Sequence, residues 1–120
     1  MTTSMKDLFA TIDRMDAAGF AAAFTENGRF RFGNAPTVTG REAVEKTVAD
    51  FFSSLQGLRH EILDVWDDGD SVISEVDVTY TRLDGSEVQL PAATIGRRRD
   101  DLLADYRIYM DVNPLFAPPE

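Results

Sequence analysis

Two Asp-Gly pairs in the second half of the chain constrain its fold more than any other feature. They are Asp68-Gly69 and Asp84-Gly85, and each separates two stretches in which apolar and polar residues alternate. Asp-Gly between alternating stretches is a strong signal for a tight β-hairpin turn. The second half is therefore predicted to be an antiparallel meander. Its strands are expected at about 58–66, 71–82, 87–98 and 102–112.

The third connection of this meander is Arg99-Asp100-Asp101, which lacks a glycine. Asp adopts a positive φ more readily than most residues, so a tight turn is still expected there. Pro91 lies inside the third predicted strand. Because proline cannot donate a backbone hydrogen bond to a neighbouring strand, its presence predicts an edge position or a bulge.

The first half of the chain begins with two predicted helices. Ser4 and Asp16 are expected to cap them, and the second helix is expected to run through Phe24. Asn27-Gly28 then predicts a turn, and residues 29–32 alternate strictly between arginine and phenylalanine, as in a short strand.

A third and longest helix follows that short strand. Thr39 with Glu42 has the pattern of a capping box at its start, and Gly57 is placed to end it. The tail from Asn113 onward is expected to be irregular. The whole of residues 1–120 is therefore predicted to be a single α+β domain, in which a strongly curved, mostly antiparallel sheet wraps around the N-terminal helices. Such a cone-shaped domain is expected to have a central pocket at its open end.

Composition removes several classes of function. The chain has no cysteine and a single histidine, His60, so thiolate sites and zinc sites built on several histidines are excluded, and no metal is expected. The formal net charge is −9, which argues against a nucleic-acid partner. No glycine-rich phosphate loop follows a predicted strand, so no nucleotide cofactor is expected. The N-terminus does not have the pattern of a signal peptide and no stretch is apolar enough to span a membrane, so we expect a cytoplasmic protein.

The order of elements and several segments resemble the SnoaL-like branch of the nuclear transport factor 2-like superfamily. The resemblance runs from about Leu8 to Phe116. The segments that carry it are 39–44, 58–66, 78–85, 105–111 and 114–116. Known members include polyketide cyclases, ketosteroid isomerases, limonene-type epoxide hydrolases and scytalone dehydratases, and others bind ligands without chemistry or mediate protein contacts. The resemblance implies a homodimer joined through the sheet.

The enzymes of this superfamily act mostly by general acid–base chemistry in a dry pocket, so carboxylates on the predicted strands are the first candidates. The strand that contains Asp77 resembles the strand of limonene-type epoxide hydrolases that carries a catalytic Asp, and Asp77 would take its place. Glu75 then stands where those enzymes keep an Arg. Alternation leaves a second interpretation open, in which Glu75 and Asp77 lie on the solvated or dimer face.

Asp111 and His60 are the other catalytic candidates. The position of Asp111 near the end of the last strand resembles that of an acid–base residue in SnoaL-like cyclases, but Asp111 could equally cap the turn that follows it. His60 shares a strand face with Leu58, Ile62 and Trp66. That face is either core or the wall of the cavity.

Two positions depart from the ketosteroid isomerases. Their general base lies in the first strand, where this chain has Phe32 or Arg31, and their helix tyrosine is replaced by Leu8. The resemblance therefore argues against ketosteroid isomerisation by that machinery.

Aromatic residues and one acid are expected to contact the ligand. These substrate-binding candidates are Phe32, Phe52, Trp66, Glu75 and Tyr109. An apolar aromatic wall suits a ring-containing metabolite. The sequence thus favours a cofactor-free acid–base enzyme of the cyclase, isomerase, dehydratase or epoxide-hydrolase type. A ligand-binding or dimeric assembly module of the same fold is the alternative.

Overall fold

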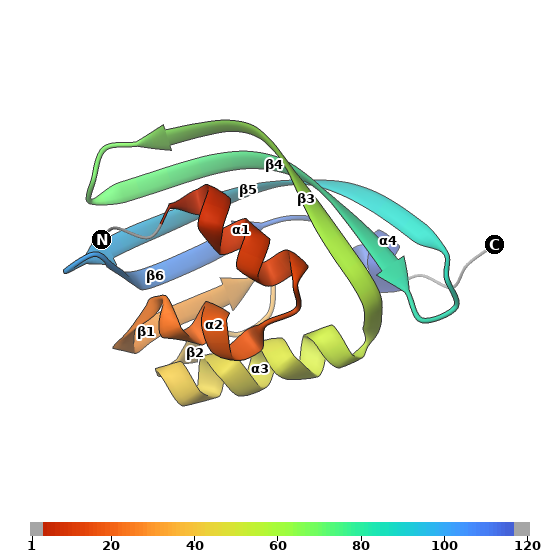
Figure 1. Cartoon of the computed structure of the whole chain (residues 1–120), viewed down its shortest axis with the longest axis horizontal. Coiled ribbons are helices and arrows are strands. Elements are labelled where there is room, and N and C mark those ends of the chain that lie inside the picture. Colours follow the sequence, from red (N-terminus) through yellow and green to blue (C-terminus); the bar gives the residue numbers. More distant parts are fainter. Residues whose placement is uncertain (1–3, 117–120) are drawn as a thin grey trace.

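The computed structural model describes residues 4–116, which form a curved six-stranded sheet with three helices against its concave face (Figure 1). The helices are α1 (Met5–Asp13), α2 (Ala17–Ala22), α3 (Arg41–Ser53) and a short α4 (Asn113–Phe116). The strands are β1 (Phe24–Phe32), β2 (Val38–Thr39), β3 (Leu55–Asp67), β4 (Ser71–Arg82), β5 (Glu87–Arg99) and β6 (Leu102–Tyr109). Residues 1–3 and 117–120 of the predicted domain lie outside the described part.

The sheet has the strand order β2-β1-β6-β5-β4-β3. Strands β3 to β6 form the predicted antiparallel meander, and only the β1–β6 pair is parallel among the described strands. The register shifts within the β3–β4, β5–β6 and β1–β6 pairs. Such irregularities bend and twist a strand, which is how the long strands curve over the helices. The predicted α+β fold with a strongly curved, mostly antiparallel sheet is confirmed.

All three predicted hairpin turns are present. Gly69 and Gly85 have φ values of 93° and 88°, and the glycine-free turn places Asp100 and Asp101 at 53° and 67°. The prediction that Asp would accept a positive φ there is confirmed. Pro91 of β5 lies opposite Asp77 of β4, and β5 pairs with β6 only from Ala93 onward. Pro91 therefore sits on a locally free edge, as its missing N–H requires.

The capping predictions have mixed outcomes. The side chain of Ser4 accepts a hydrogen bond from the backbone N–H of Asp7, and that of Asp16 accepts one from Gly19. The predicted cap at Thr39 is wrong, because Thr39 belongs to β2 and pairs with Arg29. The residue before α3 is Gly40, which has a φ of 100° and offers no capping side chain.

Four local predictions need correction. The third helix ends at Ser53 and not at Gly57, which lies in β3 and pairs with Thr81. The second helix ends before Phe24, because Phe24 already pairs with Leu103 of β6. Asn27-Gly28 lies within β1, where the pairing register shifts, and not in a separate turn. Residues 113–116 of the tail form the helix α4, where the guanidinium of Arg82 donates to the backbone carbonyl of Leu115 at 3.2 Å, and residues 117–120 lie outside the described part.

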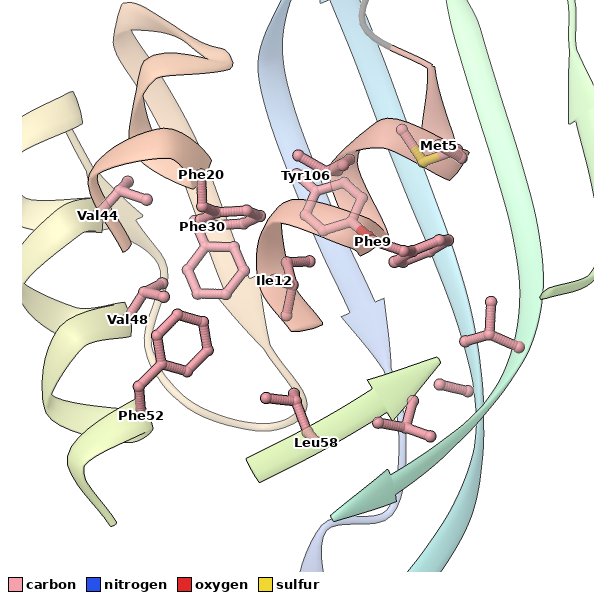
Figure 2. Close-up of a cluster of buried hydrophobic side chains, with 14 of the residues drawn as sticks. Met5, Phe9, Ile12, Phe20, Phe30, Val44, Val48, Phe52, Leu58 and Tyr106 are labelled. Atoms are coloured by element: carbon pink, nitrogen blue, oxygen red, sulfur yellow. The ribbon is translucent and has the colours of Figure 1, made fainter. Parts of the chain in front are cut away.

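Aromatic rings hold the helices on the sheet (Figure 2). The ring of Phe20 in α2 lies 5.1 Å from that of Phe24, 5.4 Å from that of Phe30 and 6.0 Å from that of Tyr106, in edge-on geometry. These side chains are almost fully buried. Edge-on pairs at such distances add to the stability that burial of the rings already supplies.

Replacing Phe24 by alanine tests this cluster. Phe24 is completely buried, so the change leaves a cavity and should lower the free energy of unfolding by about 3–5 kcal/mol. The matched control is Phe116→Ala, since Phe116 is 64% exposed, and its effect should stay within about 0.5 kcal/mol. Urea unfolding measures both, and equal losses for the two variants would contradict the packing described here.

Candidate functional site

An apolar cavity of about 60 Å³ lies between the concave face of the sheet and the helices. This is several times the roughly 10–15 Å³ that one water molecule needs. The described residues that line the cavity are Phe9, Ile12, Phe20, Phe30, Phe32, Thr47, Val48, Phe51, Phe52, Leu58, His60, Val76, Val78, Tyr80, Ala92, Thr94, Tyr106, Ile108 and Met110. The wall is therefore mainly aromatic and aliphatic, with a few polar atoms at separate points.

His60 of β3 lines this wall and is paired with Asp13 of α1. The Nδ1 atom of His60 lies 2.6 Å from Oδ1 of Asp13, and the backbone N–H of His60 donates to Oδ2 of the same carboxylate at 3.1 Å. Asp13 is the last residue of α1. The ring of Phe9, one helical turn earlier, stacks on the imidazole with the ring centroids 4.6 Å apart. The imidazole is thus held by a carboxylate at one edge and an aromatic ring on one face.

The surroundings of His60 set its protonation. Burial lowers the pKa of His60 below its ordinary value of 6.5, and the hydrogen bond and charge of Asp13 offset this only in part. The imidazole is therefore mainly neutral near pH 7. Because the carboxylate of Asp13 accepts a hydrogen bond at Nδ1, the proton of the neutral ring sits there. The lone pair is then on Nε2, which makes no hydrogen bond within residues 4–116.

Hydroxyl groups supply the other polar atoms at the wall. The Tyr80 hydroxyl donates to Sδ of Met110 at 3.6 Å, and the hydroxyls of Ser74 and Thr94 are hydrogen-bonded to each other. The Tyr106 hydroxyl has no hydrogen-bond partner in the described part of the chain. Burial raises the pKa of both tyrosines well above the ordinary value, so both stay protonated.

Three of the residues predicted from the sequence line the cavity. They are His60, Phe32 and Phe52. Asp77 and Glu75 do not line it, because β4 alternates and turns Val76, Val78 and Tyr80 inward. The two acids therefore lie on the convex face of the sheet, which is the second of the two interpretations that the sequence left open.

Asp111, Tyr109 and Trp66 are not cavity residues either. Asp111 follows the last strand, and its carboxylate accepts a hydrogen bond from the backbone N–H of Asn113 at 3.1 Å. Tyr109 and Trp66 are each 53% exposed. Tyr109 of β6 pairs with Ala93 of β5, and Ala93 pairs on its other side with Glu75 of β4. Tyr109 therefore lies on the same face of the sheet as Glu75, which is the convex face. The structure thus does not bring Asp77, Asp111 and His60 together.

Sequence reasoning missed Asp13 as a functional residue. It ends a helix, and nothing near it in the sequence suggests a partner 47 positions away. The signal that could have found it is its i, i+4 spacing from Phe9 on the buried side of α1. The described residues include no group of three or more His, Asp or Glu side chains arranged to hold a metal ion. No helix in this part of the chain is long and apolar enough to cross a membrane.

Solved structures with the same fold share little sequence with this chain. A hypothetical protein from Catenulispora acidiphila with a ketosteroid isomerase-like fold, in complex with trimethylamine, has a TM-score of 0.82 and 19% identity, over 91% of this chain and 86% of its own. A protein from Jannaschia that is described as a SnoaL-like polyketide cyclase has a TM-score of 0.76 and 20% identity, over 99% of both chains. An epoxide hydrolase of the limonene type from Mycobacterium tuberculosis has a TM-score of 0.77 and 16% identity, over 92% of this chain and 82% of its own.

At identities this low, the structural likeness shows the fold alone. No curated protein matches the chain significantly. The model of the SnoaL-like domain matches residues 5–106, which is most of the chain and includes both Asp13 and His60. The chain therefore belongs to the SnoaL-like domain family.

Proposed function

We propose that the protein is a cofactor-free acid–base enzyme that acts on a small, apolar, ring-containing molecule, with His60 as the base and Asp13 as the residue that orients it. The observation that carries the proposal is the contact of 2.6 Å between these two side chains at the wall of an otherwise apolar cavity. The reaction types of this kind in the superfamily are cyclisation, isomerisation, dehydration and epoxide hydrolysis.

The geometry supports proton transfer at Nε2. Asp13 holds the Nδ1–H tautomer and stabilises the imidazolium that forms when Nε2 takes a proton. The apolar aromatic wall strengthens electrostatic interactions with the reacting atoms, because apolar side chains compete less for them than water does. A neutral imidazole with a pKa lowered by burial is ready to accept a proton near pH 7.

The carboxylates that the sequence suggested as acid–base residues take no part in the proposed catalysis. Asp77 and Asp111 do not line the cavity, so the acid–base role that the sequence suggested for them passes to His60. The second candidate function is a ligand-binding module without chemistry. The observation that favours it is that the Asp13–His60 contact also ties α1 to β3, which a purely structural pair would do equally well.

The convex face supports a second part of the proposal, a homodimer through the sheet. Exposed apolar side chains, among them Trp66 and Ile73, lie on this face, where the two residues pair across β3 and β4. The acids Glu61 and Asp77 stand opposite each other on the same two strands. The opposite side of the sheet carries Arg29 on β1, Arg97 on β5 and Arg107 on β6, of which Arg29 and Arg107 are ion-paired with Asp105. A two-fold axis through the centre would place the acids of one copy against the arginines of the other.

The first prediction concerns a base-catalysed test reaction, the ring opening of 5-nitrobenzisoxazole. His60 takes the proton from the ring carbon, the N–O bond breaks, and a coloured cyanonitrophenolate leaves. We expect the wild-type protein to accelerate this reaction with saturation, and His60→Gln to lose about 10²–10⁴-fold of that rate. Asp13→Asn should show a smaller loss, with the product followed by its absorbance.

Asp77→Asn is the matched control for Asp13→Asn, since it makes the same change outside the cavity. Its rate should equal that of the wild type. A His60→Gln protein that keeps the full rate would overturn the base assignment, and saturable binding of the compound without acceleration would favour the binding module.

The second prediction concerns stability and pH. The pKa of His60 is lower in the folded protein than in the unfolded chain. As pH falls below about 6.5, the unfolded chain therefore takes up a proton that the folded protein resists, and stability is lost, with a slope of at most about 1.4 kcal/mol per pH unit for one proton. Urea unfolding between pH 5 and 7.5 should show this loss in the wild type and not in His60→Gln. Parallel curves for the two proteins would contradict the shift.

The third prediction concerns the dimer. Ile73 is 40% exposed on the convex face, and Ile73→Glu places a charge in the proposed interface. Light scattering after size-exclusion chromatography should show a dimer for the wild type and a monomer for the variant. Leu83→Glu is the control, because Leu83 is 64% exposed in the β4–β5 turn and should leave the dimer intact. A monomeric wild type would refute the interface.

A further inference from the structure

The hydroxyl of Tyr106 is a buried polar group without a partner. The residue has no exposed surface, and no acceptor or donor satisfies hydrogen-bond geometry with its hydroxyl among residues 4–116. The Thr94 hydroxyl lies close to that of Tyr106 and lowers its pKa slightly, but the two do not meet the geometry of a hydrogen bond, and the hydroxyl of Thr94 is bonded to that of Ser74. Leaving a buried hydroxyl unpaired costs stability, so its presence needs a reason.

The position of Tyr106 supplies a reason for the unpaired hydroxyl. The residue lines the cavity, and Figure 2 shows its hydroxyl end directed toward Phe9, the ring that stacks on His60. Tyr80 lines the same cavity, but its hydroxyl is already engaged with Met110. Because burial keeps the Tyr106 hydroxyl protonated, it can donate a hydrogen bond, and the complementary group is an acceptor on a bound molecule.

The rest of the wall restricts the charge of that molecule. None of the described residues that line the cavity is lysine or arginine. An anion would therefore lose its water without gaining a cationic partner, which is strongly unfavourable. A neutral acceptor such as a carbonyl oxygen avoids this cost.

We propose that Tyr106 determines specificity in this cavity by donating a hydrogen bond to a neutral oxygen acceptor of a ring-containing ligand. The inference rests on the proposed function only in taking the cavity as the ligand site. It does not require that His60 be a base. It adds a chemical class to the ligand, which is a neutral ring compound with a carbonyl-type oxygen and not a hydrocarbon or a carboxylate.

Three probes of nearly equal shape test the inference. Acetophenone has a neutral carbonyl, α-methylstyrene replaces that oxygen by a methylene group, and benzoate carries a negative charge. We expect the full-length wild-type protein to bind acetophenone about 3- to 10-fold more tightly than α-methylstyrene, as one hydrogen bond to a previously unpaired group implies. Benzoate should bind most weakly. Ligand-observed NMR titration measures all three.

Tyr106→Phe removes only the hydroxyl and should abolish the preference for acetophenone over α-methylstyrene. Its melting temperature should equal or exceed that of the wild type, because an unpaired buried hydroxyl is lost, and this also shows that the variant folds. Tyr80→Phe is the matched control, the same change on the same wall, and should keep the preference.

Each other result overturns the inference. A wild type that binds acetophenone and α-methylstyrene equally would mean that Tyr106 contacts at most a water molecule. A Tyr106→Phe protein that keeps the preference would place the donor elsewhere, and no binding of acetophenone at millimolar concentration would exclude the ligand class. The two proposals fail separately, because the binding preference reports on Tyr106 and the ring opening of 5-nitrobenzisoxazole reports on His60.

Discussion

The aromatic packing around Phe20 is the interaction on which the rest of the structure depends. It joins α2 to the parallel pair of β1 and β6, because the rings it meets, those of Phe30 and Tyr106, come from those two strands. This contact brings the helices onto one part of the concave face. The long strands β3, β4 and β5 extend past the ends of α1 and α3 (Figure 1). Where α1 and α3 face the sheet, the side chains that line the space leave an apolar cavity. The cavity is thus a consequence of short helices under long, bent strands.

The second constraint is the contact between Asp13 and His60. The carboxylate of Asp13 accepts two hydrogen bonds, from the ring and from the backbone N–H of His60, and these set the position of α1 against β3. The ring is stacked by Phe9 and lies at the cavity wall, so the same contact that positions the helix also selects the tautomer. A charged imidazole would be costly in this setting, which is why the pKa of His60 falls in spite of the nearby carboxylate. Structural and chemical roles of the pair therefore arise from one geometry.

Much of the fold could be predicted from local signals, whereas most of the site could not. Asp-Gly turns and alternation identify β3 to β6, and capping side chains identify α1 and α2, because those signals lie within a few residues of the structure they produce. The start of β1 at Phe24 was missed because its partner Leu103 lies far along the chain. The inward face of β4 was left open, since Val76 and Asp77 alternate equally well in either orientation. Asp13 was missed for the same reason as Phe24, because its role depends on a contact that only the folded chain creates.

Two polar atoms at the cavity wall that make no hydrogen bond within residues 4–116 give the cavity its chemical character. Nε2 of His60 makes no hydrogen bond in the described part of the chain, and the Tyr106 hydroxyl has none despite full burial. One is an acceptor and the other a donor, and aromatic and aliphatic side chains surround both. A core evolved for stability alone would favour phenylalanine at position 106, since that change removes an unpaired hydroxyl at little cost in packing. The stability given up at Tyr106 is therefore best explained by a bound molecule that supplies the missing acceptor, with the free nitrogen of His60 as a second polar group on the same cavity wall.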